Sequence, residues 1–295
     1  MRNLLDLSTQ RLIRLLEALA SQEDWMTTGE LSSLIGASER TISEDIDVLS
    51  KRWGQYLDIE TSTKKGVKIR NQSTSVLGKI LVDIFNESTA LRFLEEILFF
   101  PHNGTEFYED RLFVSRSTLT RLLPRINKYL SKRGMSAVRR NNSYQLVAED
   151  EQRLRDFFAG FLIELNGIDL SGVPHAVIRR IYSRSLNGQE FDFAVNDELS
   201  KLFNGVFYFV SLLRENQGYN VSSAYDIEGE IEDGELSYFR GLFPNISADN
   251  LRPIHKFIRD QISGWTSEEE RALVQRETAV FFENIFREIA HAPCG

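Results

Sequence analysis

Apolar residues recur at helical spacing through most of the chain, and one arrangement appears twice in its first half. The segments Gly36–Ser43 and Phe113–Thr120 each place a serine where it can accept a hydrogen bond from an amide at a helix start. The apolar stripes that follow superpose under a shift of 77 residues: Ile42, Ile46, Leu49 and Trp53, then Leu119, Leu123, Ile126 and Leu130. This pattern predicts a repeated structural unit.

The surroundings of the first copy predict a helix-turn-helix. Its short second helix begins at a capping box formed by Thr27 and Glu30. Gly36 then permits the tight turn into the long helix, because glycine has no side chain to clash at positive φ. The opening and short helices are expected to bury these residues: Leu12, Leu16, Leu19, Leu31, Leu34 and Ile35.

Beyond the first long helix, a period of two residues predicts a β-hairpin, the wing of a winged helix-turn-helix. Lys64-Lys65-Gly66 forms its basic turn. The alternating positions of the two strands are Leu57, Ile59, Thr61, Val67 and Ile69.

The second copy predicts the same order of elements: an opening helix that buries Leu91, Leu94 and Leu98, a short helix over Glu106–Leu112, the long helix, and a hairpin of Ala137–Arg140 and Tyr144–Val147 around Asn141-Asn142-Ser143. Pro124 lies inside the long helix, where the missing amide predicts a kink. The kink either curves the helix around a groove or ends its base-reading part at Leu123.

Charge is distributed unevenly along this acidic chain, whose net charge is −8. Residues 1–148 carry a net charge of +3 and residues 149–295 a net charge of −11. Nine basic residues and no acidic ones lie between Arg111 and Arg140. A solvated helix normally mixes both signs, so this stretch favours a nucleic-acid-binding face.

Each long helix therefore has a candidate DNA-binding face, because a helix fits the major groove and basic groups beside it contact phosphates. The second unit offers Arg116, Ser117, Thr118, Arg121, Arg125, Lys128, Arg139 and Arg140. The first offers Arg40, Thr41, Ser43, Lys64, Lys65, Lys68 and Arg70. Glu44 and Asp47 share the face of the first helix, which either reads sequence with help from its wing or serves partly as a packing surface.

From Asp150 onward the spacing predicts helices: a first one with an apolar face from Leu154 to Leu165, then stretches near Pro174–Leu186, Asn196–Glu215, Ala248–Ser263 and Ser267–Ala290. Aromatic residues such as Phe203, Phe207, Tyr208 and Phe209 predict a core, with an exposed partner groove as the alternative. The acidic stretch Asp226–Glu235 lacks the ligand periodicity of an EF-hand and is interpreted as a solvated loop.

No catalytic, cofactor or metal motif is found in the sequence. Its single cysteine is Cys294, no two histidines have metal-ligand spacing, and phosphate-binding glycine loops and nucleophile motifs are absent. We therefore expect neither an enzyme nor a cofactor. The apolar runs are too short to span a bilayer and the N-terminus lacks a signal peptide, which predicts a cytoplasmic protein.

The segment Leu112–Leu119, the basic helix after it and Tyr144–Val147 resemble the second helix-turn-helix of the Mga-like regulators, virulence regulators of Gram-positive bacteria. The segment from Ser38–Ile42 to Lys65–Ile69 is similar to the family's first domain. Asp150–Phe158 matches the entry into its helical regulatory domain, and the resemblance covers about residues 1–165.

The resemblance implies a transcription regulator, an activator by family analogy, that binds double-stranded DNA and forms a homodimer. In that family the helical domains resemble those controlled by the sugar phosphotransferase system, so a phosphocarrier is an expected partner and His175 a possible phosphorylation site, near Arg179 and Arg180. Family members usually carry further domains, so this chain is expected to be a short member or a fragment.

The sequence thus predicts a mainly α fold with two winged helix-turn-helix domains, 1–74 and 75–148, and a helical regulatory or dimerisation domain, 149–295. The main alternative is that the winged helices bind a protein partner rather than DNA. An RNA-binding antiterminator is disfavoured because such proteins begin with a small sheet, whereas this N-terminus is helical. An enzyme would need an unrecognised site.

Overall fold

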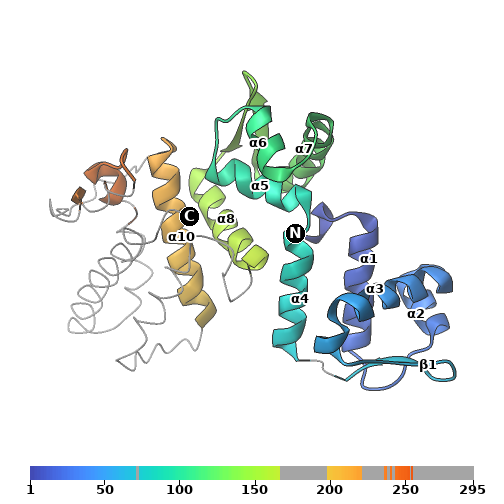
Figure 1. The fold of residues 1–295 in the computed structure, drawn as a ribbon. Coiled ribbons are helices and arrows are strands. Elements are labelled where there is room, and N and C mark those ends of the chain that lie inside the picture. Colours follow the sequence, from blue (N-terminus) through green and yellow to red (C-terminus); the bar gives the residue numbers. More distant parts are fainter. Residues whose placement is uncertain are drawn as a thin grey trace, which may run out of the picture. The chain divides into compact units, whose positions relative to one another are not determined.

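In a computed structural model the described residues are 1–70, 73–166, 198–220, 236–237, 240, 243–252 and 254 (Figure 1). Helices predominate among them, and their strands form two separate antiparallel pairs, which confirms the predicted fold class. The chain divides into two compact units. The first comprises Met1–Glu95 and Glu106–Tyr129, and the second Glu96–Thr105 and Leu130–Gly295.

The first unit opens with the predicted helices. A short 3-10 helix (Arg2–Leu4) leads into α1 (Leu7–Ala20), α2 (Thr28–Ile35) and α3 (Glu39–Leu57). The expected core positions are buried with one exception, since Leu34 is 62% exposed. In a helix Leu31 and Ile35 stack on one face, whereas Leu34 is turned by about 100° from Ile35 and faces solvent.

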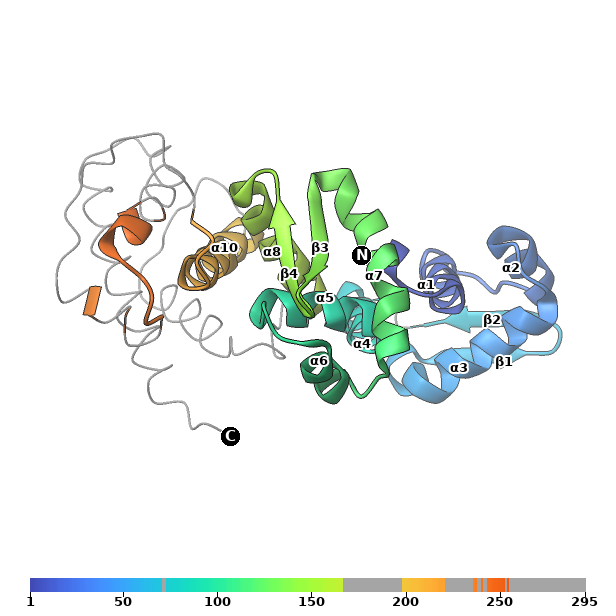
Figure 2. The ribbon, with the colours of Figure 1, turned by 90° about the horizontal axis from the view of Figure 1, so that it is seen from above.

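The first hairpin consists of β1 (Ile59–Ser62) and β2 (Gly66–Ile69), with Ile59 opposite Ile69 (Figure 2). The assignment of Leu57 to a strand is wrong. Leu57 is the buried last residue of α3, and Asp58, at φ 49°, ends the helix in a left-handed conformation. The alternation begins only at Ile59, because the stripe of the helix continues to its last turn.

The hairpin is held to the chain before α2 by a third backbone pairing. Met26 and Val67 exchange two hydrogen bonds, with N···O distances of 2.9 and 2.8 Å. At Gly66, where φ is 99°, a Cβ atom would lie 2.0 Å from the carbonyl oxygen of Met26. This position therefore requires glycine for both its backbone angle and its close contact.

Helix α4 (Thr74–Asn86) was not among the predicted elements. It packs on α3, where the indole Nε1 of Trp53 donates to Asp83 Oδ2 at 3.0 Å and Arg52 pairs with Glu87. This contact explains why Trp53, the last stripe position of the first copy, is almost fully buried.

The second copy forms α5 (Thr89–Phe99), α6 (Thr105–Leu112) and α7 (Arg116–Leu130). Helix α7 continues through Pro124 to Leu130. Leu123 itself is only half-buried, unlike the other three stripe positions of α7. The rings of Phe93 and Tyr108 pack edge to face, with centroids 5.5 Å apart.

The second unit contains the second hairpin and the described helices of the acidic half. After a short 3-10 helix (Ser131–Arg133), β3 (Met135–Arg140) pairs with β4 (Ser143–Ala148). Asn141 and Asn142 have φ values of 50° and 64°, as a two-residue hairpin turn requires. Ser143 already belongs to β4, so the turn is one residue shorter than predicted.

Helices α8 (Glu151–Asn166) and α10 (Glu198–Asn216) lie side by side beyond the hairpin (Figure 2). The predicted apolar face of α8 is buried except for Phe157, which is half-buried. Phe207 is also buried, which agrees with a core for the aromatic residues whose side chains are described.

Gly66→Ala is expected to destabilise the first hairpin by about 1–3 kcal/mol, because the added methyl group collides with the Met26 carbonyl and the backbone angle becomes strained. Hydrogen exchange at the Met26 and Val67 amides measures this change. Gly78→Ala in α4 is the control, since nothing lies within 4 Å of its Cβ position. That change should stabilise its helix by about 0.5–1 kcal/mol. Equal effects at both positions would contradict the explanation.

Candidate nucleic-acid interface

The first candidate face is built on the turn between α2 and α3. Gly36 adopts a left-handed conformation with φ 74°, and Ser38 Oγ accepts a hydrogen bond from the Thr41 amide at 3.2 Å. The predicted capping box of α2 is present, since Glu30 Oε2 accepts from the Thr27 amide at 2.7 Å and Thr27 Oγ1 accepts from the Glu30 amide at 3.2 Å. These local signals fix where α3 begins, and hence which residues lie on its outer face.

The outer face of α3 carries both signs of charge. Arg40 and Ser43 are exposed and Thr41 is half-buried. Arg40 Nε lies 3.0 Å from Glu44 Oε1, and both side chains are mostly exposed. A solvent-exposed pair of this kind contributes little stability, but it neutralises a basic group that DNA phosphates would otherwise attract.

A partly buried ion pair fixes the opposite side of α3. Arg11 of α1 donates to Asp45 through Nε at 2.6 Å and Nη2 at 3.1 Å. The hydrogen bond with Asp45 raises the pKa of Arg11 above its ordinary value. This pair, which the sequence pattern did not reveal, turns Asp45 away from the candidate DNA face.

The second candidate face is that of α7. Ser115 Oγ accepts from the Thr118 amide at 3.4 Å at the start of this helix. Six of the predicted contacts lie on it. The exposed residues are Arg116, Ser117, Arg121 and Lys128, and the half-buried ones are Thr118 and Arg125. Within the described part of the chain, the guanidinium groups of Arg116 and Arg121 have no acidic partner.

Position 113 departs from the repeat. Gly36 in the first turn corresponds to Phe113 in the second, and Phe113 adopts φ 54° while remaining 92% exposed. Left-handed backbone disfavours residues other than glycine, asparagine and aspartate. The turn geometry is therefore preserved although the residue that favours it is absent.

The wings present further basic groups. Lys64 and Lys65 are exposed at the first tip, where Lys65 Nζ lies 5.7 Å from the ring centre of Trp25. Lys68 is half-buried, and Arg70 Nη2 pairs with Glu60 Oε1 at 2.6 Å. On the second hairpin, Arg139 and Arg140 are both exposed.

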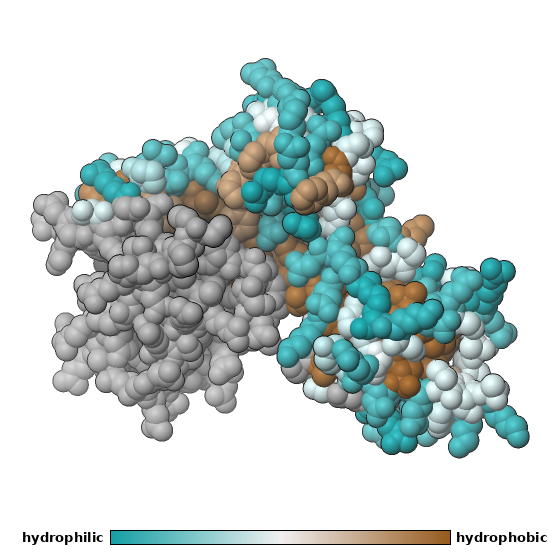
Figure 3. All heavy atoms as spheres, viewed as in Figure 1, coloured by the Kyte–Doolittle hydropathy of each residue, from teal (hydrophilic) through white to brown (hydrophobic). Residues whose placement is uncertain are grey.

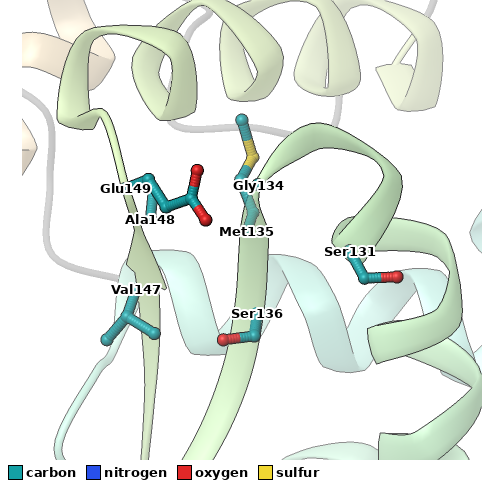
Figure 4. A pocket seen from close by; sticks show the side chains of 7 residues that line it. All are labelled: Ser131, Gly134, Met135, Ser136, Val147, Ala148 and Glu149. Carbon is teal, nitrogen blue, oxygen red and sulfur yellow. The ribbon is translucent and has the colours of Figure 1, made fainter.

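The described surface in the view of Figure 3 is mostly hydrophilic, with hydrophobic residues in smaller patches. A shallow pocket lies where the second hairpin begins, lined by Ser131, Gly134, Met135, Ser136, Val147, Ala148 and Glu149 (Figure 4). Its only charged side chain is the carboxylate of Glu149, so the pocket does not suit a phosphate group.

Several predicted features lie outside the described residues: His175, Arg179, Arg180, Pro174–Leu186, Asp226–Glu235, Ser267–Ala290 and Cys294. Among the residues that are described, no group of three or more histidine, cysteine or acidic side chains is arranged to hold a metal ion. None of the described helices has the length and apolar character needed to cross a membrane.

The paired arrangement of turn, exposed polar helix and following hairpin defines a helix-turn-helix protein. Residues 73–162 match the family model of the Mga helix-turn-helix domain. This match covers the second copy of the repeat and most of α8, and it confirms the resemblance to the Mga-like regulators.

Three regulators are also similar to the chain. A protein described as a trans-acting regulator of Streptococcus pneumoniae serotype 4 is 27% identical over 164 residues, 56% of this chain and 32% of that protein. The capsule synthesis positive regulator AcpB of Bacillus anthracis is 24% identical over 213 residues, 72% of this chain and 43% of AcpB. AcpA from the same organism is 25% identical over 126 residues, 43% of this chain and 26% of AcpA.

The matched segments thus span less than half the length of each relative. The family and the relatives are regulators rather than enzymes, in agreement with the lack of a catalytic motif in the sequence.

Asp45→Ala should lower the free energy of unfolding by about 1–3 kcal/mol, because it leaves Arg11 partly buried without its carboxylate. Asp47→Ala removes an exposed acid from the same helix and should change stability by less than about 0.5 kcal/mol. Urea unfolding followed by tryptophan fluorescence compares the two. Equal midpoints would show that the Arg11–Asp45 pair does not stabilise the helix-turn-helix.

Proposed function

We propose that this chain is a DNA-binding transcription regulator that uses two winged helix-turn-helix domains, 1–74 and 75–148. The observation that carries the proposal is the outer face of α7, within a segment that matches the Mga helix-turn-helix domain. There the guanidinium groups of the exposed Arg116 and Arg121 have no acidic partner among the described residues. Unpaired basic groups on one helix face provide the electrostatic attraction that brings a protein to the phosphate backbone.

The two domains contribute unequally to DNA affinity because the charges on their long helices differ. Glu44 of α3 takes the position that Arg121 has in α7, so the second domain supplies more of the affinity. Arg121 is a candidate for paired hydrogen bonds to guanine in the major groove. The remaining polar groups of both helices and of the wings then orient the protein on the duplex. On the helices these are Arg40, Thr41, Ser43, Arg116, Ser117, Thr118, Arg125 and Lys128, and on the wings Lys64, Lys65, Lys68, Arg139 and Arg140.

The direction of regulation is proposed to be activation, since AcpA and AcpB are named positive regulators. Residues 149–295 are proposed to form a control domain that also mediates homodimerisation in the cytoplasm. A two-fold dimer would place its recognition helices on repeated half-sites.

Replacing both Arg116 and Arg121 by alanine should weaken binding to random duplex DNA about tenfold and reduce the slope of log affinity against log salt by about 2. Both residues are exposed, so the core should be unaffected. Fluorescence anisotropy across a salt series gives affinity and slope together.

The control variant removes two other exposed arginines, Arg92 of α5 and Arg153 of α8. It has the same net charge, and its slope should match that of the wild type if α7 makes the contacts. Wild-type protein that fails to bind DNA at low salt would overturn the proposal and favour the alternative that the winged helices bind a protein.

A phosphocarrier of the sugar phosphotransferase system is a proposed regulatory partner, with His175 as the acceptor. Transfer of labelled phosphate to the wild type but not to His175→Ala is the expected result. A phosphoryl group would add a charge of about −2 that Arg179 or Arg180 can pair with. Unchanged labelling of the variant would exclude His175, and failure to label the wild type would exclude the partner.

A further inference from the structure

Four charged side chains form a buried ionic cluster between α8 and α10: Glu151, Arg155, Arg214 and Glu215. Arg214 donates to Glu151 through Nε and Nη2, both at 2.8 Å, and Arg155 Nη2 donates to Glu215 Oε1 at 2.7 Å. The two arginines are 1% or less exposed. Removing one member of such a cluster would leave a buried charge without a partner, so the cluster fixes the two helices together.

The residues that follow α10 extend from this cluster onto the second hairpin. Tyr219 Oη lies 3.0 Å from His102 Nε2 and donates to Gln145 Oε1 at 3.3 Å. Its ring stacks on that of His102, with centroids 5.8 Å apart and planes at 8°. The guanidinium of Arg214, a member of the ionic cluster, lies over the ring of Tyr219, 3.5 Å from its centre.

Gln217, the residue directly after α10, caps α5. Gln217 Nε2 donates to the carbonyl oxygens of Leu98 and Phe99, at 3.0 and 3.2 Å. The last carbonyls of a helix have no partner within it, so a side-chain donor from elsewhere satisfies them. We call Arg214, Gln217 and Tyr219 the α10 joint.

The loop that Tyr219 contacts is paired with the hairpin itself. His102 donates its amide to the carbonyl of Tyr144 at 2.7 Å, and the Tyr144 amide donates to Asn103 at 3.1 Å. Strand β4 is therefore held by this loop and by the α10 joint, both within the second compact unit. Arg139 and Arg140 project from the other strand of the same hairpin.

We propose that the α10 joint positions the second wing for DNA, so that the helical half determines whether Arg139 and Arg140 reach the phosphates. This inference rests on the proposed function. The joint contacts the wing through the hydrogen bond of Tyr219 to Gln145 of β4, and it holds the adjoining end of α5 through the hydrogen bonds of Gln217. Such contacts fix a direction as well as a distance. Its residues are positioning residues, because none of them needs to touch DNA.

The test is a double-mutant cycle on DNA affinity between a joint variant, Tyr219→Phe with Gln217→Ala, and a wing variant, Arg139→Ala with Arg140→Ala. In the wild-type background the wing variant should bind DNA about tenfold more weakly, and the slope of log affinity against log salt should fall by about 2. In the joint variant the same wing change should cost less than about threefold, because the wing is no longer held in place.

Ser211→Ala is the matched control, since this buried hydroxyl of α10 donates to the Phe207 carbonyl within its own helix, at 2.8 Å. It should leave the full wing effect intact. Hydrogen exchange without DNA gives a second measurement: the His102 and Tyr144 amides should exchange at least about tenfold faster in the joint variant and not in Ser211→Ala.

Additive effects in the cycle, or unchanged exchange at the two amides, would overturn the role of the joint while leaving the proposed function intact. A wild-type protein that binds no DNA would instead overturn the proposed function. Thermal unfolding of each variant shows whether the fold is retained, and Tyr219→Phe alone, which keeps the stacked ring, is the milder change if the double variant unfolds.

Discussion

Burial of one apolar stripe along each long helix is the constraint on which both helix-turn-helix units depend. Ile42 and Leu49 in α3, and Leu119 and Ile126 in α7, are completely buried. A helix has 3.6 residues per turn, so burying this stripe leaves a single outward face, and the shift that aligns the stripes also aligns the faces. The units therefore share a geometry and differ in charge. Charged residues on an exposed face can be replaced during evolution at little cost in stability.

Elements with local signals were predictable from the sequence. Capping residues and the Gly36 turn located α2 and α3 closely, because each signal acts within about one helical turn. The second turn was predictable only by analogy with the first, since Phe113 gives no local sign of a left-handed backbone. The errors at Leu34 and Leu57 lie at the ends of helices. There a shift of one position along the chain decides whether a side chain packs in the core or faces solvent.

Contacts between distant segments were not predictable. Arg155 and Glu215 are separated by 60 residues, and charged residues on a helix normally indicate a solvated face. Which of them become buried depends on how α8 and α10 pack. The candidate DNA-binding residues were easier to predict, because exposure on a helix face follows from the position of the stripe. The half-buried state of Arg125 and the pairing of Arg40 with Glu44 still required the structure.

The capping of α5 by Gln217 has an evolutionary consequence. Consider a recombination event that joins the DNA-binding part of this protein to the control domain of another. A crossover after β4 would bring a foreign α10 against the carbonyls of Leu98 and Phe99, and without a donor at the same place each would lose its hydrogen bond. The hairpin, the end of α5 and the helical half should therefore be inherited together, with sequence changes on one side followed by compensating changes on the other.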